Sequence, residues 1–317
     1  MEVGYHVSHE QFSPSRLLSL CRLAEDAGFA QIKSSDHFHP WSERQGQSGF
    51  AWAWLGAALQ SCALPIGTIA APGYRYHPAI IAQAAATLAE MFPDRFWMAL
   101  GSGEAINEAI TGLPWPEKSE RMALLEECVA IIRALFAGEE VTHRGRVTVI
   151  GAKLYSRPAN PVPLMGAAVT KETAARVAGW ADGLLTVGGK PENVAQVLDA
   201  FRENGGEGKP VHVQHALSWA PTRSEAMAEV RHQWRHAVLG GDAMWDLRRP
   251  ADFDAASASA SDEALDACLP ISEDLGRHTA DIAALAALGV TVHLHSIGRN
   301  QEQFLDMFGT RVLPQLT

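Results

Sequence analysis

Short apolar segments alternate with longer helical patterns along almost the whole chain, and this alternation limits the possible folds more than any other feature. Strands are expected at residues 3–7, 30–34, 64–71, 96–100, 162–166, 183–187, 211–217 and 290–295. Helices are expected at about residues 14–28, 50–61, 78–91, 117–136, 170–179, 191–202, 224–236 and 280–288. Strict alternation favours a parallel sheet, and eight such units favour a closed barrel over an open sheet. The sequence therefore predicts an α/β fold, the (β/α)8 TIM barrel.

The whole chain, residues 1–317, is expected to form one barrel domain with two insertions. The first insertion, at about 141–156, follows the fourth helix and suits a small hairpin. The second, at about 239–267, separates the last two units and contains the low-complexity run Ala255–Ser261. Connections of this length are usually lids or mobile segments.

The charge and cysteine content exclude several classes of protein. The net charge is −10, and no cluster of Lys and Arg is present, so a nucleic-acid or anionic-membrane partner is not expected. No apolar stretch is long enough to span a membrane, and no signal peptide is recognised. The four cysteines are widely spaced, which predicts reduced core or near-core thiols in a reducing compartment. We expect a cytoplasmic homodimer that acts on a small molecule.

Candidate site residues follow the second, third and fourth strands, and in a TIM barrel the active site lies at these strand ends. The segments are Ser34–Trp41, Ala71–Pro78 and Gly101–Glu108. Each candidate also has an ordinary structural explanation. Asp36 can cap a turn, His37 can be a satisfied buried histidine, and Trp41 can belong to the core. Their position on one rim favours a functional site.

Two His-x-His pairs raise the alternative of a metal-dependent hydrolase barrel. The pairs are His37 with His39 and His293 with His295, and residues two apart in a strand share a face. However, the first pair follows strand two, and strands five and six offer no His or Lys ligand. An open catalytic site needs three protein ligands. We therefore expect no bound metal.

The rim segments resemble the deazaflavin-dependent glucose-6-phosphate dehydrogenases of the luciferase-like monooxygenase superfamily. The resemblance rests first on Ser35–Trp41 and Gly101–Glu108, read together. It extends to Val7–Phe12, Tyr74–Ala84 and Ala181–Gly183. It is dense over residues 2–138 and thinner beyond them.

This resemblance implies a barrel that binds a flavin-type cofactor at its mouth. The cofactor ring would lie against a bulge in strand three, with a non-proline cis peptide near Ile69 and Ala70. The family implies catalytic roles for His37, Trp41 and Glu104, the last exchanging a proton with substrate. The residues expected to bind the cofactor are Asp36, Ile69, Ala70, Ser102, Gly103, Asn107, Ala168, Val169 and Thr170.

Two departures from the family pattern bear on substrate and cofactor. Lys190 and Arg277 match two of three basic residues that hold the substrate phosphate, but Met244 stands at the third position. Two cations should hold a phosphate less tightly than three. Val169 and Thr170 replace a Gly pair, and this segment is more like the phosphate loop of flavin mononucleotide (FMN) relatives. The cofactor is therefore expected to be FMN or F420, with the loop favouring FMN.

The sequence thus predicts a flavin- or deazaflavin-dependent oxidoreductase, acting as a dehydrogenase or monooxygenase on an unidentified small organic substrate. The protein would orient the cofactor and supply a proton carrier. A non-catalytic flavin-binding subunit on the same fold is the alternative, because a fold alone does not settle function. The joint presence of His37, Trp41 and Glu104 favours the enzyme, since a binding module would not need all three.

Overall fold

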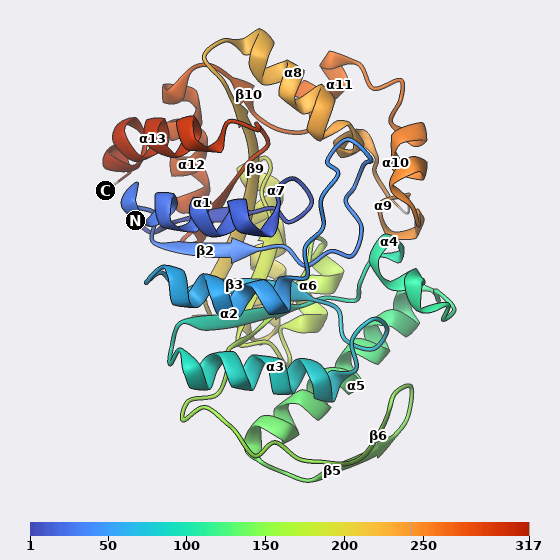
Figure 1. Ribbon diagram of the computed structural model, residues 1–317. Helices are drawn as coiled ribbons and strands as arrows, with labels where there is room; N and C mark the ends of the chain where they lie inside the picture. The colour runs from blue at the N-terminus through green and yellow to red at the C-terminus, as the bar shows by residue number, and fades with distance from the viewer. Residues whose placement is uncertain (242, 317) are drawn as a thin grey trace.

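The computed structural model describes residues 1–241 and 243–316. Eight parallel strands close into a barrel, because β9 pairs with both β8 and β11 and so joins the two ends of the sheet. This confirms the predicted (β/α)8 fold (Figure 1). Around the barrel the strands are β1 (Val3–Val7), β2 (Gln31–Ser34), β3 (Ile66–Ala70), β4 (Phe96–Leu100), β7 (Leu164–Ala167), β8 (Gly183–Val187), β9 (Val211–Trp219) and β11 (Thr291–Ser296).

Helices surround this barrel and connect successive strands. They are α1 (Pro14–Asp26), α2 (Ala51–Ser61), α3 (Pro78–Met91), α5 (Lys118–Ala137), α6 (Lys171–Val177), α7 (Pro191–Phe201), α8 (Arg223–Gln233), α12 (Leu275–Ala286) and α13 (Gln301–Arg311). The sequence pattern did not predict α13, which follows the last strand and packs against α1. Helix α12 begins five residues before the predicted helix, because the Asp274 side chain caps it by accepting from the Gly276 N–H at 2.8 Å.

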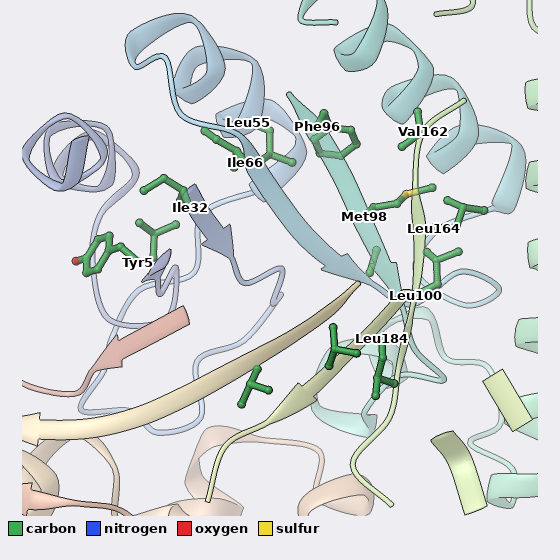
Figure 2. Close-up of a cluster of buried hydrophobic side chains, with 14 of the residues drawn as sticks. Tyr5, Ile32, Leu55, Ile66, Phe96, Met98, Leu100, Val162, Leu164 and Leu184 are labelled. Atoms are coloured by element: carbon green, nitrogen blue, oxygen red, sulfur yellow. The ribbon is translucent and has the colours of Figure 1, made fainter. Parts of the chain in front are cut away.

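Alternate residues of each strand face opposite sides of the barrel wall, as β4 illustrates. Phe96, Met98 and Leu100 point outward into the layer between strands and helices (Figure 2). Trp97 and Ala99 belong to a separate cluster inside the barrel. The outer layer forms the main core, and its burial of apolar surface provides most of the driving force for folding.

Large side chains inside the barrel are matched by glycines at the paired position of the neighbouring strand. A Cβ atom on Gly67 would lie 1.9 Å from the Trp97 ring, and one on Gly4 would lie 2.3 Å from His293. The Trp97 ring stacks on His212 with centroids 4.5 Å apart. These rings fill the barrel interior, as is usual for this fold, and leave room for a site at its mouth.

Two expectations about local structure are wrong. Every peptide bond in the described chain is trans, so the predicted cis bond near Ile69 and Ala70 is not present. Both residues pair in regular register with β4, and a trans bond costs less energy. Cys268 is exposed rather than near the core, because it follows a short surface helix, whereas the other three cysteines are buried.

Both predicted insertions carry secondary structure. Residues 141–156 contain an antiparallel hairpin of β5 (Val141–Arg144) and β6 (Thr148–Ala152). The second insertion contains α9 (Ala243–Asp246), α10 (Pro250–Ala256) and α11 (Asp262–Asp266). It leads into the two-residue strand β10 (Ile271–Ser272), which extends the sheet beside β9. The second insertion is therefore folded onto the barrel mouth, as Figure 1 shows, rather than forming a long irregular loop.

Candidate active site at the barrel mouth

A cavity of about 370 Å³ opens at the C-terminal end of the barrel strands. This volume lies at the lower end of the range usual for small-molecule sites. All twelve residues assigned to catalysis or cofactor binding line it, namely Asp36, His37, Trp41, Ile69, Ala70, Ser102, Gly103, Glu104, Asn107, Ala168, Val169 and Thr170. The structure thus brings together residues that lie more than 130 positions apart in the sequence.

His37 lies between two carboxylates at the centre of this cavity. Its Nε2 atom is 3.5 Å from Glu10 Oε1 and 3.5 Å from Glu104 Oε2. Glu10 follows β1, His37 follows β2, and Glu104 follows β4. The other ring nitrogen of His37 is buried without a hydrogen-bond partner in the described chain. An imidazole held in this way can accept or donate a proton on the side facing the carboxylates.

The two carboxylates differ in their affinity for protons. Burial alone would raise the pKa of Glu10, but His37 and the Ser8 hydroxyl, which donates at 2.6 Å, lower it to about 2. Burial raises the pKa of Glu104, and the neighbouring Glu10 raises it further. Glu10 is therefore ionised at neutral pH, whereas Glu104 retains its proton to a higher pH than usual. Neighbouring groups whose pKa values differ in this way are suited to acid–base roles.

Glu104 is positioned by Asn107 and not by helix capping. It stands at the N-cap of the short helix α4 (Ala105–Glu108), but its side chain makes no capping hydrogen bond. Its Oε2 atom instead accepts from Asn107 Nδ2 at 3.1 Å. Asn107 Oδ1 in turn accepts from the backbone N–H of Phe38 at 2.9 Å. Asn107 thus joins the loop after β4 to the loop that carries His37.

Asp36 is buried in a network at the base of the cavity. Tyr76 donates to its Oδ1 atom at 2.9 Å, and the Arg75 guanidinium lies 3.4 Å from Oδ2. The guanidinium also lies 3.7 Å from Glu108, which accepts from the Arg75 backbone N–H at 2.9 Å. Burial raises the pKa of Asp36, and it raises that of Glu108 to about 7. One cation therefore serves two buried carboxyl groups.

An aromatic wall forms one side of the cavity. The Trp41 ring stacks on His236 with centroids 5.2 Å apart and an interplanar angle of 15°. Phe253 of the second insertion meets the Trp41 ring edge-on at 5.3 Å, and Trp234 lies 4.4 Å from His236. Burial lowers the pKa of His236 to about 3, so this ring is neutral. Together with Met244, the wall offers apolar contacts to a ligand.

The opposite side of the cavity fits a planar aromatic cofactor with a polar edge. Ile69, Ala70 and Gly103 line it with apolar or small residues, and a Cβ atom on Gly103 would lie 2.9 Å from Glu108. His37 Nδ1 is buried and has no hydrogen-bond partner in the described chain, whereas Asp36 Oδ2 has the Arg75 guanidinium 3.4 Å away. Buried polar atoms without partners are rare in native proteins and often mark a ligand position. The apolar lining residues and the neighbouring polar side chains of Asp36 and His37 therefore fit a flavin-type ring.

A more polar end of the cavity lies between the starts of α5 and α6. Thr170 caps α6 and accepts from the Thr173 N–H at 3.3 Å, so the ordinary capping role is present. Lys118 and Arg121, from the first turn of α5, line the same cavity. Cations beside a helix start suit a phosphate or another anion. A role for Thr170 in holding the cofactor phosphate stays a prediction.

The two cations predicted to hold a substrate phosphate do not line this cavity. Lys190 and Arg277 are exposed, Lys190 just before α7 and Arg277 within α12. Met244, by contrast, is among the lining residues. Substrate binding by Lys190 and Arg277 therefore stays a prediction and has no geometric support.

Several lining residues were not predicted individually. Glu10 lies three positions beyond the first strand. The rule that the active site of a TIM barrel lies at the C-terminal ends of its strands would have identified it. Lys33 reads as an unremarkable strand residue, and His236 follows α8 without any local motif. Only the closed barrel brings these two side chains to the cavity.

The two His-x-His pairs do not form metal centres in the described chain. His39 Nδ1 lies 2.7 Å from the Ile106 carbonyl, whereas His37 faces Glu10 and Glu104. Among residues 1–241 and 243–316, no three His, Cys, Asp or Glu side chains are grouped so that they could hold a metal ion.

Within the same residues, no helix is both long enough and apolar enough to cross a membrane.

Comparisons with known proteins agree with this geometry. A family model described as luciferase-like monooxygenase matches residues 1–292. An F420-dependent glucose-6-phosphate dehydrogenase from Microbacterium testaceum (strain StLB037) is 35% identical, over 100% of this chain and 97% of the relative. A solved F420-dependent secondary alcohol dehydrogenase, in complex with an F420-acetone adduct, gives a TM-score of 0.91 at 28% identity, over 100% of this chain and 99% of that one.

A more distant structure shows the same fold with another cofactor. It is the oxygenating constituent of 3,6-diketocamphane monooxygenase from Pseudomonas putida, in complex with FMN. The two chains give a TM-score of 0.75 at 15% identity, with 100% of this chain and 99% of that chain covered. At this identity the likeness concerns the fold alone.

Proposed function

Because the chain belongs to the luciferase-like monooxygenase family and is a flavin- or deazaflavin-dependent oxidoreductase, we propose that it transfers hydride between F420 and a small uncharged alcohol or ketone. The observation that carries this proposal is the placement of His37 between Glu10 and Glu104 inside the cavity. Oxidation of an alcohol releases a hydride from carbon and a proton from oxygen. The site provides a proton acceptor next to a surface that fits the hydride carrier.

The residues divide the proton chemistry between them. His37 Nε2 would accept the hydroxyl proton, and ionised Glu10 would stabilise the imidazolium that forms. Glu104, with its raised pKa, would donate the proton that the hydride carrier takes up together with the hydride, so that one proton leaves the alcohol and one enters the cofactor. Trp41 would confine the reacting carbon against the cofactor, which supplies the hydride chemistry when bound. Asp36 would hold the edge of the ring, and Asn107 would hold the loop that bears His37.

The family relatives favour F420 as the cofactor. The relative that is 35% identical over the whole chain is named for its use of F420. FMN is the second candidate, favoured by Val169 and Thr170 at the start of α6, where the sequence resembles FMN-binding loops. With FMN as the cofactor, the reaction could be that of a monooxygenase. Either cofactor would place its phosphate near Thr170, Lys118 and Arg121.

An uncharged substrate is favoured because the cations around the cavity already have partners or lie at its polar end. Arg75 is held by Asp36 and Glu108, and Lys33 donates to Gln214. Arg121 and Lys118 lie at the polar end, which the cofactor phosphate would occupy. The wall beside His37 offers aromatic rings and a thioether instead. A sugar phosphate would thus bury its charge without a free cation, which is costly.

Two assays test this proposal. Titration of the apo-protein with F420 and with FMN, followed by fluorescence, should show tight binding of F420 at one equivalent per chain. Reduction of bound F420 should then be faster with neutral secondary alcohols, such as 2-propanol or cyclohexanol, than with glucose-6-phosphate. Tight binding of FMN with no affinity for F420 would contradict the cofactor assignment. Efficient turnover of glucose-6-phosphate would contradict the substrate class.

A further inference from the structure

Lys33 is a buried cation that the proposed chemistry does not use. It lies on β2, is 3% exposed, and points into the barrel where it borders the cavity. None of the described carboxylates lies within ion-pairing distance of its ammonium, which donates one hydrogen bond, to Gln214 Oε1 on β9. A buried charge is retained only where its environment compensates it, so this position requires a reason.

The ammonium fixes the direction of a chain of hydrogen bonds, because it can only donate. Since Gln214 presents Oε1 to Lys33, its Nε2 atom faces His295 Nδ1 at 3.2 Å. That amide nitrogen also only donates, so His295 Nδ1 must accept and the ring proton must lie on Nε2. His295 Nε2 is 3.0 Å from Gln11 Oε1, an acceptor, in agreement with this assignment. Burial also lowers the pKa of His295 to about 3, so the ring is neutral.

The chain continues to the wall of the cavity. Gln11 Nε2 donates to the side-chain Oε1 of Gln233 at 3.1 Å, and the backbone carbonyl of the same residue accepts from Gln45 Nε2 at 3.1 Å. Gln45 Oε1 then accepts from the backbone N–H of Trp41 at 2.8 Å. We call this set of residues, Gln11, Gln45, Gln214, Gln233 and His295, the glutamine belt. It runs from the barrel interior to the backbone of Trp41.

We propose that Lys33 is a positioning residue, which orients the Gln214 amide and, together with Gln11, holds His295 as its Nε2-protonated tautomer against the aromatic wall. The His295 ring meets Trp234 edge-on at 4.8 Å, and Trp234 in turn contacts His236, which stacks on Trp41. Gln11 is held independently, because its Nε2 also donates to the backbone carbonyl of Ile297 at 3.0 Å. Without the donor at Lys33, the Gln214 amide can rotate by half a turn, and His295 Nδ1 then loses the donor that keeps it unprotonated, so that Gln11 alone selects the tautomer.

The tautomer of His295 can be measured directly in the cofactor-free protein by NMR after labelling with ¹⁵N-histidine, with His295→Asn used to assign the signals. We expect Nδ1 unprotonated and Nε2 protonated in the wild type. Lys33→Met should shift the Nδ1 resonance toward the protonated range and should move the ring-proton signals of His236. Lys33→Gln, which retains a donor without the charge, should restore most of the wild-type pattern.

Two further variants make the result decisive. Lys209→Met removes another partly buried lysine, which donates to a carbonyl far from the belt, and should leave His295 and His236 unchanged. Gln214→Leu removes the same link from the β9 side and should reproduce the effect of Lys33→Met, even if one of the two variants folds poorly. A wild-type His295 protonated on Nδ1 would overturn the proposal. So would a tautomer that neither substitution changes.

Discussion

Among the individual residues of the site, Glu104 has the most specific expected role. Its side chain does not cap α4, so the usual structural explanation for a glutamate at this position is not supported. We predict that Glu104→Gln lowers turnover by about a hundred- to ten-thousand-fold, because Gln keeps the bond with Asn107 but cannot carry a proton. The dissociation constant of the cofactor should change little. Turnover and cofactor affinity, measured on the same preparation, test this.

His37→Ala serves as the comparison for Glu104→Gln. An imidazole at the ring edge would contact cofactor and substrate alike, so this variant should weaken both binding and turnover. A Glu104→Gln protein that is less stable but fully active would remove Glu104 from the proton path.

Glu108 should give the protein a pH-dependent stability. Its pKa of about 7 in the folded state lies above the ordinary value of 4.5, so the folded form binds the proton more tightly than the unfolded chain does. The resulting stabilisation is complete below pH 4.5 and is lost as the pH rises through 7. Glu108→Gln should therefore gain stability relative to wild type between pH 5 and 7, by roughly 1–3 kcal/mol. Thermal unfolding of both proteins across this range measures the difference, and parallel curves would contradict the prediction.

The sequence predicted the site residues that follow a strand directly and missed those placed by distant packing. Asp36, His37 and Glu104 belong to short motifs at strand ends, where the barrel fold alone brings them together. His236 and Lys33 have no such local signal. Their place in the site depends on where α8 ends and on which face of β2 turns inward, and both follow from tertiary packing.

At the scale of elements, the strands were predicted most accurately and the second insertion least. Short apolar runs that contain β-branched and aromatic residues indicate buried strands. The strands β1, β4 and β8 match the predicted bounds. The Ala and Ser residues of the insertion indicate no fixed structure. In the structure, however, α10 inserts Phe253 into the aromatic wall, and Asp254 and Asp262 of the insertion pair with Arg44 and Arg231. Apolar and ionic contacts together therefore hold the segment in place.

Phe253→Ala should therefore affect substrate binding as well as stability. The side chain is fully buried, and its removal should cost about 3–5 kcal/mol. Loss of the edge contact with Trp41 should also raise the KM for a neutral alcohol more than it raises the Kd for the cofactor. Phe201→Ala is the matched control, because Phe201 is equally buried but lies in α7, away from the cavity. Equal changes of KM in the two variants would show that Phe253 acts through stability alone.

For the whole molecule, the closed barrel was predictable because eight alternating units leave few other topologies. The trans peptides of β3 and the helix α13 were not predicted. The homodimer, the cytoplasmic location and the domain limits of 1–317 stay predictions.

The absence of a cation at Met244 allows a gain-of-function test with glucose-6-phosphate. Met244→Lys adds a cation at the position where the phosphate-binding relatives are basic, and we predict a rise in kcat/KM for glucose-6-phosphate of about tenfold or more. Met244→Leu, which adds no charge, should leave this activity low. Steady-state kinetics with both variants decide the point, and an unchanged activity in the lysine variant would show that the phosphate binds elsewhere or not at all.

The proposed function requires that this barrel mouth holds the ring of a flavin-type cofactor beside His37 and Glu104. A crystal structure of the protein with bound F420 tests it most directly, with FMN as the second ligand. We expect the ring between the ends of β2, β3 and β4, near Asp36, Ile69 and Glu104, with the phosphate toward Thr170. A ring bound elsewhere on the molecule, with this cavity empty, would contradict it.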